Sequence, residues 1–324
     1  MEKSQRKIQN TSVCVIGGLG FLGSHLVDYL IDERNCEVLV LDNLITGKEK
    51  FKHPKAKFVW CDITHSEMQL IKLFKEHKVE YVFNYSAEPY IPVSFERPLH
   101  VFDINARGAL MAMNASHNAG VKAFLQVSSA EIYGDAPEHP INEEYPARPH
   151  STYGASKLAI DSLVQARWRE AKVPAIALRQ FNCIGERETH PYVVTTIIEQ
   201  LFSGGHDGIS KKVKLGNNSF RDFQYAGDAV RMAVELLEKG EFGEVYNMGS
   251  EEGIKIYDLA EKLGATHIEV DESRVRAWEI WHLQSDNTKL YSVIDYRPKT
   301  TLEEALKKTV DYYKSNEGWD FNDK

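Results

Sequence analysis

The sequence predicts an α/β fold in which a parallel sheet is covered by helices on both faces. Two observations predict it. Six apolar segments of strand length recur along the first 181 residues, and most of them are separated by stretches with helical patterning. These segments are almost continuously apolar, which is typical of parallel strands buried on both faces.

The expected strands carry few charges, as buried strands require. A helix is expected over 21–35. Leu22, Leu26 and Leu30 fall on one of its faces, which indicates an amphipathic helix packed on the sheet. A second, longer helix is expected after Tyr153. The strands are expected over 13–18, 37–42, 57–62, 79–85, 123–129 and 175–181.

Beyond about residue 181 the pattern becomes shorter and irregular. A helix over 228–238 and a strand-like segment over 244–250 still fit the main sheet. We therefore expect two interleaved units. They are a main domain at 1–181 with a returning segment at about 222–250, and a smaller lobe made of 182–221 and 251–324.

Composition argues against several classes of partner. A formal net charge of −8 offers no concentrated basic face, so neither a nucleic acid nor an anionic membrane is expected to bind. The N-terminus is polar, and neither a signal-peptide core nor a membrane span follows it, so a cytoplasmic protein is expected. The cysteines have no histidine at metal-ligand spacing, so we expect no metal site and interpret them as small core residues. They are Cys14, Cys36, Cys61 and Cys183.

A dinucleotide site is predicted where the first strand ends. Gly17, Gly20 and Gly23 recur at every third residue before the first helix. Glycine allows a tight turn and a close approach of the backbone to a pyrophosphate, and a helix N-terminus attracts the anion. Asp42 ends the next strand, 19 residues after Gly23, near the spacing of an acid that binds the ribose hydroxyls. A carboxylate there repels a 2′-phosphate, so NAD is expected. For Asp62, at the end of the third strand, an adenine contact and a helix cap stay open.

A second motif lies on the longer helix. Tyr153 and Lys157 are four residues apart and therefore share one helical face. An ammonium group favours a nearby phenolate, so the pair is typical of a tyrosine that accepts a proton. Such pairs also occur on solvated helices. Here the pair accompanies a glycine loop and a serine at a strand end, Ser129, and this combination indicates a catalytic site.

Taken together, the motifs resemble those of the extended short-chain dehydrogenase/reductases, specifically the nucleotide-sugar epimerases and dehydratases. The resemblance covers nearly the whole chain and includes the glycine loop, "SSAEIYG", "YGASK", "RQFNCIG" and "SFRDFQYAGD". It implies a Rossmann-type doubly wound sheet with a smaller C-terminal lobe that binds the substrate. It also implies a bound NAD that transiently oxidises carbon 4 of an NDP-hexose, and a homodimer.

The resemblance implies roles for individual residues. Tyr153 looks like the base for the sugar 4-hydroxyl, with Lys157 lowering its pKa and Ser129 hydrogen-bonded to the same oxygen. The implied cofactor contacts are Gly17, Gly20, Phe21, Leu22, Asp42, Asn43, Asp62, Ile63, Ser86, Ala87, Asn105, Tyr153 and Lys157. The implied substrate contacts are Glu88, Asn182, Arg221 and either Arg274 or Arg276, and for Arg221 a surface ion pair with Asp222 is the alternative.

Three reactions compete after oxidation at carbon 4, and Glu131 bears on the choice. A 4,6-dehydratase removes the carbon-5 proton and expels the carbon-6 hydroxyl, and its motif runs Ser/Thr, Asp/Ser, Glu. Ser129, Ala130 and Glu131 occupy these positions, so the base is matched and the usual acid is missing. One carboxyl group can serve both roles in sequence.

The other two reactions make different demands. A 4-epimerase needs only Tyr153, Ser129 and room for the keto sugar to turn over. A UDP-glucuronate-type decarboxylase also uses a Ser/Thr-x-Glu triplet, but Gly154 and Leu158 depart from its tyrosine motif. The sequence therefore favours the dehydratase, followed by the epimerase and then the decarboxylase.

Overall fold

The computed structural model describes residues 6–202, 211–275 and 278–315. Its centre is a seven-stranded parallel sheet with the order β10-β6-β5-β4-β1-β2-β3. The order reverses between β1 and β4, so a crevice forms there at the carboxyl ends of the strands. The predicted doubly wound sheet is confirmed. Its strands are β1 (Ser12–Ile16), β2 (Glu37–Asp42), β3 (Lys57–Trp60), β4 (Tyr81–Asn84), β5 (Ala123–Ser129), β6 (Ala175–Gln180) and β10 (Val245–Met248).

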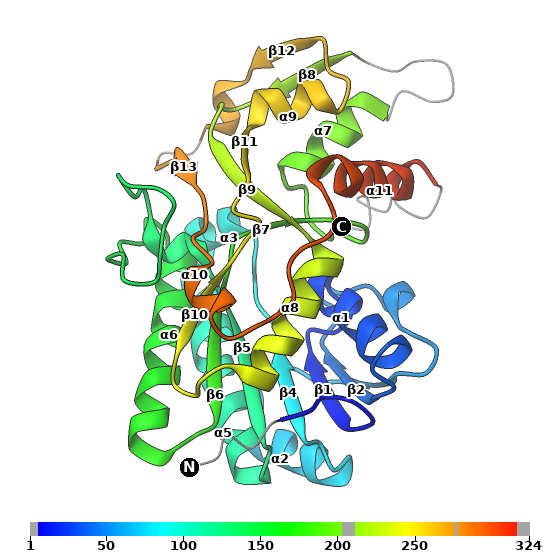
Figure 1. Cartoon of the computed structure of the whole chain (residues 1–324), viewed down its shortest axis with the longest axis vertical. Coiled ribbons are helices and arrows are strands. Elements are labelled where there is room, and N and C mark those ends of the chain that lie inside the picture. The colour runs from blue at the N-terminus through cyan, green and yellow to red at the C-terminus, as the bar shows by residue number, and fades with distance from the viewer. Residues whose placement is uncertain (1–5, 203–210, 276–277, 316–324) are drawn as a thin grey trace.

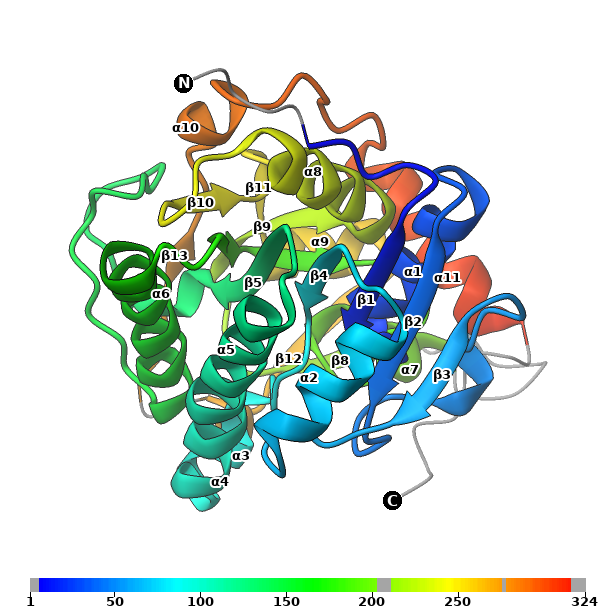
Figure 2. The ribbon, with the colours of Figure 1, turned by 90° about the horizontal axis from the view of Figure 1, so that it is seen from below.

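Helices cover both faces of this sheet (Figure 2). Side chains alternate along β1, so Val13 and Val15 belong to one buried cluster while Cys14 and Ile16 belong to another. This alternation explains why the strands are apolar throughout. One face carries α1 (Phe21–Asp32) and α8 (Ala226–Lys239), and the other carries α2 (Glu67–Glu76), α5 (Ala109–Ala119) and α6 (Thr152–Ala171).

A smaller lobe lies above the carboxyl ends of the main strands (Figure 1). Strand β9 (Phe220–Tyr225) is central in it and pairs with β7 (Asn182–Ile184), β11 (Gly253–Lys255) and β13 (His282–Leu283). A separate pair joins β8 (Lys212–Leu215) to β12 (His267–Val270). The helices of the lobe are α7 (Val193–Phe202), α9 (Ile256–Lys262) and α11 (Leu302–Lys314), and the remaining short helices are α3 (Ile91–Glu96), α4 (Pro98–Phe102) and α10 (Thr288–Tyr291).

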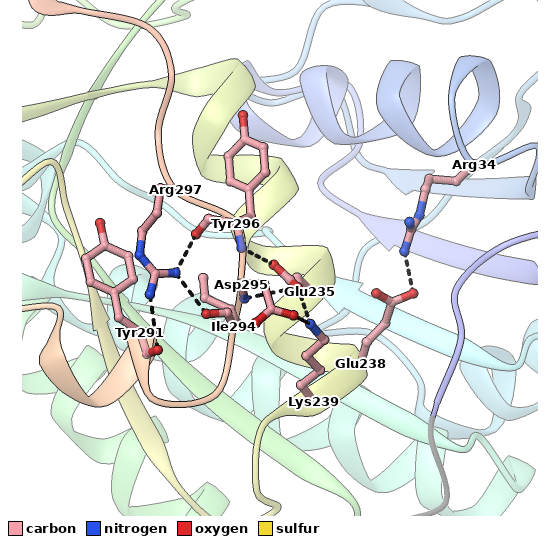
Figure 3. A network of polar contacts seen from close by, with 9 residues as sticks. All are labelled: Arg34, Glu235, Glu238, Lys239, Tyr291, Ile294, Asp295, Tyr296 and Arg297. Carbon is pink, nitrogen blue, oxygen red and sulfur yellow. Dashed lines mark hydrogen bonds and ion pairs between the residues drawn. The ribbon is translucent and has the colours of Figure 1, made fainter.

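One C-terminal segment returns to the main domain. Leu290 and Ile294 belong to the buried cluster that includes residues of α1 and α8. The carboxylate of Glu235 on α8 accepts hydrogen bonds from the backbone N–H groups of Asp295 and Tyr296, at 3.1 and 2.7 Å (Figure 3). The expected division, which gave all of 251–324 to the lobe, therefore misses this return.

The described part of the chain contains no helix that combines the length and the apolar character needed to cross a bilayer. The cysteines are free thiols. Three of them, Cys14, Cys36 and Cys61, are buried, and Cys183 is partly buried.

Candidate active site

A cleft of about 460 Å³ opens at the carboxyl ends of the sheet and is lined by both the main domain and the lobe. Most of the predicted site residues line it. Arg276 lies outside the described residues. The predicted residues at the cleft are Gly17, Gly20, Phe21, Leu22, Asp42, Asn43, Asp62, Ile63, Ser86, Ala87, Glu88, Ser129, Glu131, Tyr153, Lys157, Asn182, Arg221 and Arg274.

The glycine loop joins β1 to α1 at one end of the cleft. Gly17 has a φ of +74°, and a Cβ there would lie 2.7 Å from the backbone nitrogen of Ser86. A Cβ on Gly23 would lie 2.0 Å from the carbonyl oxygen of Gly17. A Cβ on Gly20 would meet only that carbonyl, at 3.4 Å, so the fold itself does not need glycine there. Its position at the N-terminus of α1 suits the close approach of an anion.

Asp42 lies at the end of β2 and is held by the backbone of two neighbouring loops. Its carboxylate accepts hydrogen bonds from the N–H groups of Leu19 and Leu44, both at 2.9 Å. Burial raises the pKa of Asp42, and these hydrogen bonds oppose the rise. The carboxylate is therefore fixed beside the glycine loop, where the ribose of a dinucleotide is expected.

Asp62 follows β3 and organises the neighbouring turn. It accepts hydrogen bonds from the hydroxyl of Thr64 at 2.6 Å and from the Asn43 side-chain amide at 3.1 Å. Burial raises its pKa, but these hydrogen bonds outweigh that effect, so the pKa of Asp62 is lowered. The side chain is thus ionised and holds Asn43 at the wall of the cleft.

Tyr153 lies in the first turn of α6, where the Ser151 hydroxyl caps the helix by accepting the N–H of Gly154 at 3.0 Å. Its phenol is hydrogen-bonded to Ser129, which ends β5. The Lys157 ammonium lies 5.7 Å from the centre of the Tyr153 ring and donates to the carbonyl of Val127 at 3.1 Å. The three predicted catalytic groups therefore meet at one place.

The pKa values of this group differ from the expectation. Burial raises the pKa of Tyr153, the hydrogen bond with Ser129 opposes the rise, and the charges of Glu131 and Glu88 add to it. Burial also lowers the pKa of Lys157 to about 8. The expected lowering of the Tyr153 pKa by Lys157 is therefore not seen within the chain itself, because burial dominates and Lys157 is not among the groups that shift this pKa.

Glu131 stands on the short 3₁₀ turn that follows β5. Its backbone N–H donates to the Ser129 hydroxyl at 3.2 Å, and its side chain lines the cleft. The negative charge of Glu131 acts on the Tyr153 phenol. Ala130 is only 1% exposed and carries no polar group. One carboxyl group therefore stands beside the Ser129–Tyr153 pair on this turn.

Asn105 does not line the cleft, although it was expected to contact the cofactor. Its side chain holds the main chain of Glu88 instead. The Asn105 carbonyl accepts the Glu88 N–H at 2.8 Å, and its amide donates to the Glu88 carbonyl at 3.2 Å. The same amide lies 3.2 Å from the Ser156 hydroxyl on α6. Asn105 therefore positions the loop after β4.

Arg221 on β9 lies in the lobe wall of the cleft. Its guanidinium contacts the Glu279 carboxylate at 3.0 Å, whereas Asp222 points away and accepts hydrogen bonds from Ser250 and Ser285. The alternative of an Arg221–Asp222 pair is therefore wrong. Glu279 is a cleft residue that the sequence interpretation missed. Its only signal was its position shortly after the two candidate arginines.

Arg274 lines the cleft on the same side, but it is far more exposed than Arg221. Its side chain is 48% exposed and pairs with Asp271 at 3.2 Å. Because an exposed pair of this kind is weak, Arg274 can exchange Asp271 for a ligand at little cost.

Four buried oxygen atoms of cleft-lining residues lack partners among the described residues. They are the Tyr85 hydroxyl, Oε1 of Gln180, Oδ1 of Asn182 and Oε2 of Glu188. Burial raises the pKa of Glu188 to about 8, and a hydrogen bond with Thr195 opposes this. Buried polar atoms are normally satisfied, so these atoms suit a ligand that brings hydrogen-bond groups. Glu188 was not predicted, since nothing in the local sequence indicates burial.

An aromatic cluster of Tyr90, His190 and Tyr192 lines the cleft. Tyr90, in the loop after β4, stacks on His190 with ring centres 5.5 Å apart and an interplanar angle of 6°. Tyr192 meets Tyr90 edge-on at 6.1 Å, and its hydroxyl donates to the Pro89 carbonyl at 3.3 Å.

The cleft as a whole suits two ligands. At one end, the glycine loop and the fixed carboxylate of Asp42 suit a dinucleotide. At the other end, the Tyr153 phenol, the carboxyl groups and Arg221 suit an anionic ligand that carries hydroxyl groups.

Comparisons with known proteins agree with this geometry. A family model described as the NAD dependent epimerase/dehydratase family matches residues 13–249. The dTDP-D-glucose 4,6-dehydratase of Mus musculus is 28% identical, over 94% of this chain and 89% of that protein.

Solved structures of an epimerase and of a dehydratase resemble this chain. The UDP-glucose 4-epimerase of Thermotoga maritima, solved with UDP-glucose, superposes with a TM-score of 0.85 at 30% identity, covering 94% of this chain and 98% of that one. The dTDP-glucose 4,6-dehydratase of Streptomyces venezuelae, solved with NAD, gives 0.84 at 26% identity, covering 95% and 98%.

Proposed function

The chain belongs to the NAD-dependent epimerase/dehydratase family, and we propose that within this family it is an NDP-sugar 4,6-dehydratase. Its family and relatives show that it is an NAD-dependent enzyme that modifies nucleotide sugars. One observation favours the dehydratase. The Glu131 carboxyl lines the cleft, and its charge acts on the Tyr153 phenol.

The chain offers contacts for the cofactor along one side of the cleft. The N-terminus of α1 with Gly17 and Gly20 would hold the pyrophosphate, Asp42 the adenine ribose, and Lys157 the nicotinamide ribose. Bound NAD supplies the acceptor and donor of hydride for the sugar. The chain's own residues handle the protons.

Tyr153 takes the proton of the 4-hydroxyl, and Ser129 keeps this oxygen in place by hydrogen bonding. Because burial raises the pKa of Tyr153, the phenolate needs cationic support. The Lys157 ammonium gives part of that support, and the positively charged nicotinamide ring of bound NAD would add to it. Once carbon 4 is a ketone, the proton on carbon 5 becomes acidic, and Glu131 takes it.

Substrate contacts on the lobe side complete the proposal. Arg221 and Arg274 would meet the diphosphate, since guanidinium groups suit phosphate oxygens. Asn182 would accept a hydrogen bond from a sugar hydroxyl through its unpartnered Oδ1. In this proposal the main domain binds NAD, and the lobe binds the nucleotide sugar.

We also propose that the enzyme is a homodimer. Phe95, Leu99 and Phe102 on α3 and α4 are 53%, 82% and 44% exposed. Neighbouring exposed apolar side chains favour a protein interface. A Leu99→Glu variant that stays dimeric in analytical ultracentrifugation would argue against this face as the interface.

The second candidate function is an NDP-sugar 4-epimerase. Ala130 favours it, because this buried residue cannot supply the acid that a dehydratase usually carries. The similarity to the Thermotoga maritima UDP-glucose 4-epimerase points the same way.

The experiment is to incubate the enzyme with a panel of UDP-, dTDP-, GDP- and CDP-sugars, including UDP-glucuronate, in heavy water. Mass spectrometry and NMR then identify the product. Loss of one water with deuterium at carbon 5 supports the dehydratase. Unchanged mass with an inverted carbon 4 supports the epimerase, and loss of carbon dioxide supports a decarboxylase.

A further inference from the structure

Two carboxyl groups act on the phenol of Tyr153. Besides Glu131, the charge of Glu88 raises the pKa of Tyr153, and both side chains line the cleft. The other acids along the described cleft wall have different surroundings. Asp42 is hydrogen-bonded at the glycine loop, and Asp62 is hydrogen-bonded within the turn after β3. Glu279 pairs with Arg221. The charge of Glu188 is not among those that shift the pKa of Tyr153.

Glu88 is fixed relative to Tyr153 by a continuous chain of hydrogen bonds. Asn105 holds both the N–H and the carbonyl of Glu88. The Asn105 amide also reaches Ser156, whose hydroxyl donates to the Tyr153 carbonyl at 2.7 Å. The loop after β4 and the first turn of α6 are thus tied together, which fixes the main chain of Glu88 relative to Tyr153.

The surroundings of Glu88 favour its protonated form. The residue is 7% exposed, and burial raises the pKa of its carboxyl group. Its Oε1 accepts the N–H of Tyr90 at 3.2 Å, which opposes this rise only in part. A carboxyl group that keeps its proton more readily than an ordinary glutamate is suited to act as an acid.

We propose that Glu88 is the general acid of the elimination step and takes the place of the acid that Ala130 lacks. The inference rests on the proposed dehydratase function. In the 4-keto sugar, Glu131 removes the proton from carbon 5, and the electron pair of that C–H bond turns the single bond between carbons 5 and 6 into a double bond. The bond from carbon 6 to its hydroxyl breaks, and the Glu88 proton passes to the departing oxygen, so that water leaves. The step has no net oxidation.

The test compares substrates with different leaving groups. The wild type, Glu88→Gln and Glu138→Gln are each given dTDP-glucose and UDP-glucose, together with their 6-deoxy-6-fluoro analogues. Glutamine keeps an acceptor for the Tyr90 N–H but has no acidic proton. Fluoride departs as an anion and needs far less help from an acid. Glu138 is exposed and lies outside the cleft, so its variant is the matched control.

In Glu88→Gln we expect water loss to slow by about 100-fold or more, the usual range for a general acid. Fluoride loss should stay within a few-fold of the wild type, and NAD binding should be unchanged. Unchanged water loss in Glu88→Gln would overturn the role of Glu88. If Glu88→Gln slows the release of water and the release of fluoride by the same factor, the role of Glu88 as an acid is also overturned, because equal slowing indicates a positioning role. If the wild type releases neither water nor fluoride from either nucleotide, the dehydratase proposal fails for these substrates, and the inference falls with it.

Discussion

The Lys157 ammonium lies 5.7 Å from the centre of the Tyr153 ring, one helical turn further along α6. Ser129 reaches the same phenol from the end of β5. A strand end and a helix start therefore meet at the one group that must exchange a proton with the sugar.

The first prediction concerns the Tyr153 hydroxyl. Tyr153→Phe keeps the buried ring but removes the proton acceptor, so kcat should fall by roughly 10²- to 10⁴-fold. NAD affinity, measured by fluorescence titration, should change little. Tyr145→Phe is the control, because Tyr145 lies outside the described cleft wall. Turnover by Tyr153→Phe close to that of the control would remove Tyr153 from the mechanism.

The second prediction separates two glycines of one loop. Gly23→Ala places a Cβ 2.0 Å from the Gly17 carbonyl oxygen. It should destabilise the protein by about 1–3 kcal/mol, the usual cost of overpacking. Gly20→Ala meets its nearest atom at 3.4 Å, so its stability should be almost unchanged. Its affinity for NAD should fall by about tenfold, or roughly 1.4 kcal/mol, because the Cβ faces the expected pyrophosphate.

Urea unfolding and calorimetric titration with NAD measure both effects. The account of the loop is contradicted if Gly20→Ala binds NAD as the wild type does, or if both variants lose the same stability.

The third prediction concerns the choice between NAD and NADP. Asp42→Asn removes the charge and keeps an oxygen for one of the two backbone N–H groups, those of Leu19 and Leu44, which bond separate oxygens of the carboxylate. The ratio of the Kd for NADP to the Kd for NAD should fall by about tenfold. This corresponds to a loss of roughly 1.4 kcal/mol in the preference for NAD over NADP. Asp311→Asn on the exposed face of α11 is the control. An unchanged ratio of the two constants would mean that Asp42 does not select the cofactor.

The fourth prediction concerns pH and Glu188. Burial raises the pKa of Glu188 to about 8, so the folded state binds this proton more tightly than the unfolded state does. Its contribution to stability is therefore present below the ordinary glutamate pKa and is lost as the pH rises through about 8. In Glu188→Gln this pH-dependent loss is removed.

Urea unfolding of both proteins at a mildly acidic and a mildly alkaline pH tests this directly. The unfolding free energy of Glu188→Gln minus that of the wild type should increase with pH, on the order of 1 kcal/mol or more. A difference that stays constant between the two pH values would mean that Glu188 titrates as an ordinary glutamate.

Much of the main domain could be predicted because its signals are local. Each strand is apolar over its own length, and the glycines and Asp42 stand at fixed spacings from β1 and β2. The return of the segment around Leu290 and Ile294 could not be predicted in this way. It depends on contacts such as the one between Glu235 and the backbone of Asp295, 60 residues further along the chain.

The site shows the same limit. Tyr153, Lys157, Ser129 and Glu131 were recognisable from type and spacing, but their burial was not. Burial sets the direction of the pKa shift for both Tyr153 and Lys157, and it depends on how the sheet, α6 and the lobe pack together. Glu279 was missed for a related reason, because its meeting with Arg221 spans 58 residues.

The central claim is that Glu131 removes the carbon-5 proton of a 4-keto sugar. The most direct measurement compares Glu131→Gln with the wild type on the NDP-hexose that the wild type dehydrates, in heavy water. The account predicts that the variant still binds NAD and still reduces it, seen as absorbance of the reduced nicotinamide, while it releases no water and places no deuterium at carbon 5. Full product formation by Glu131→Gln, with deuterium at carbon 5, would contradict the claim.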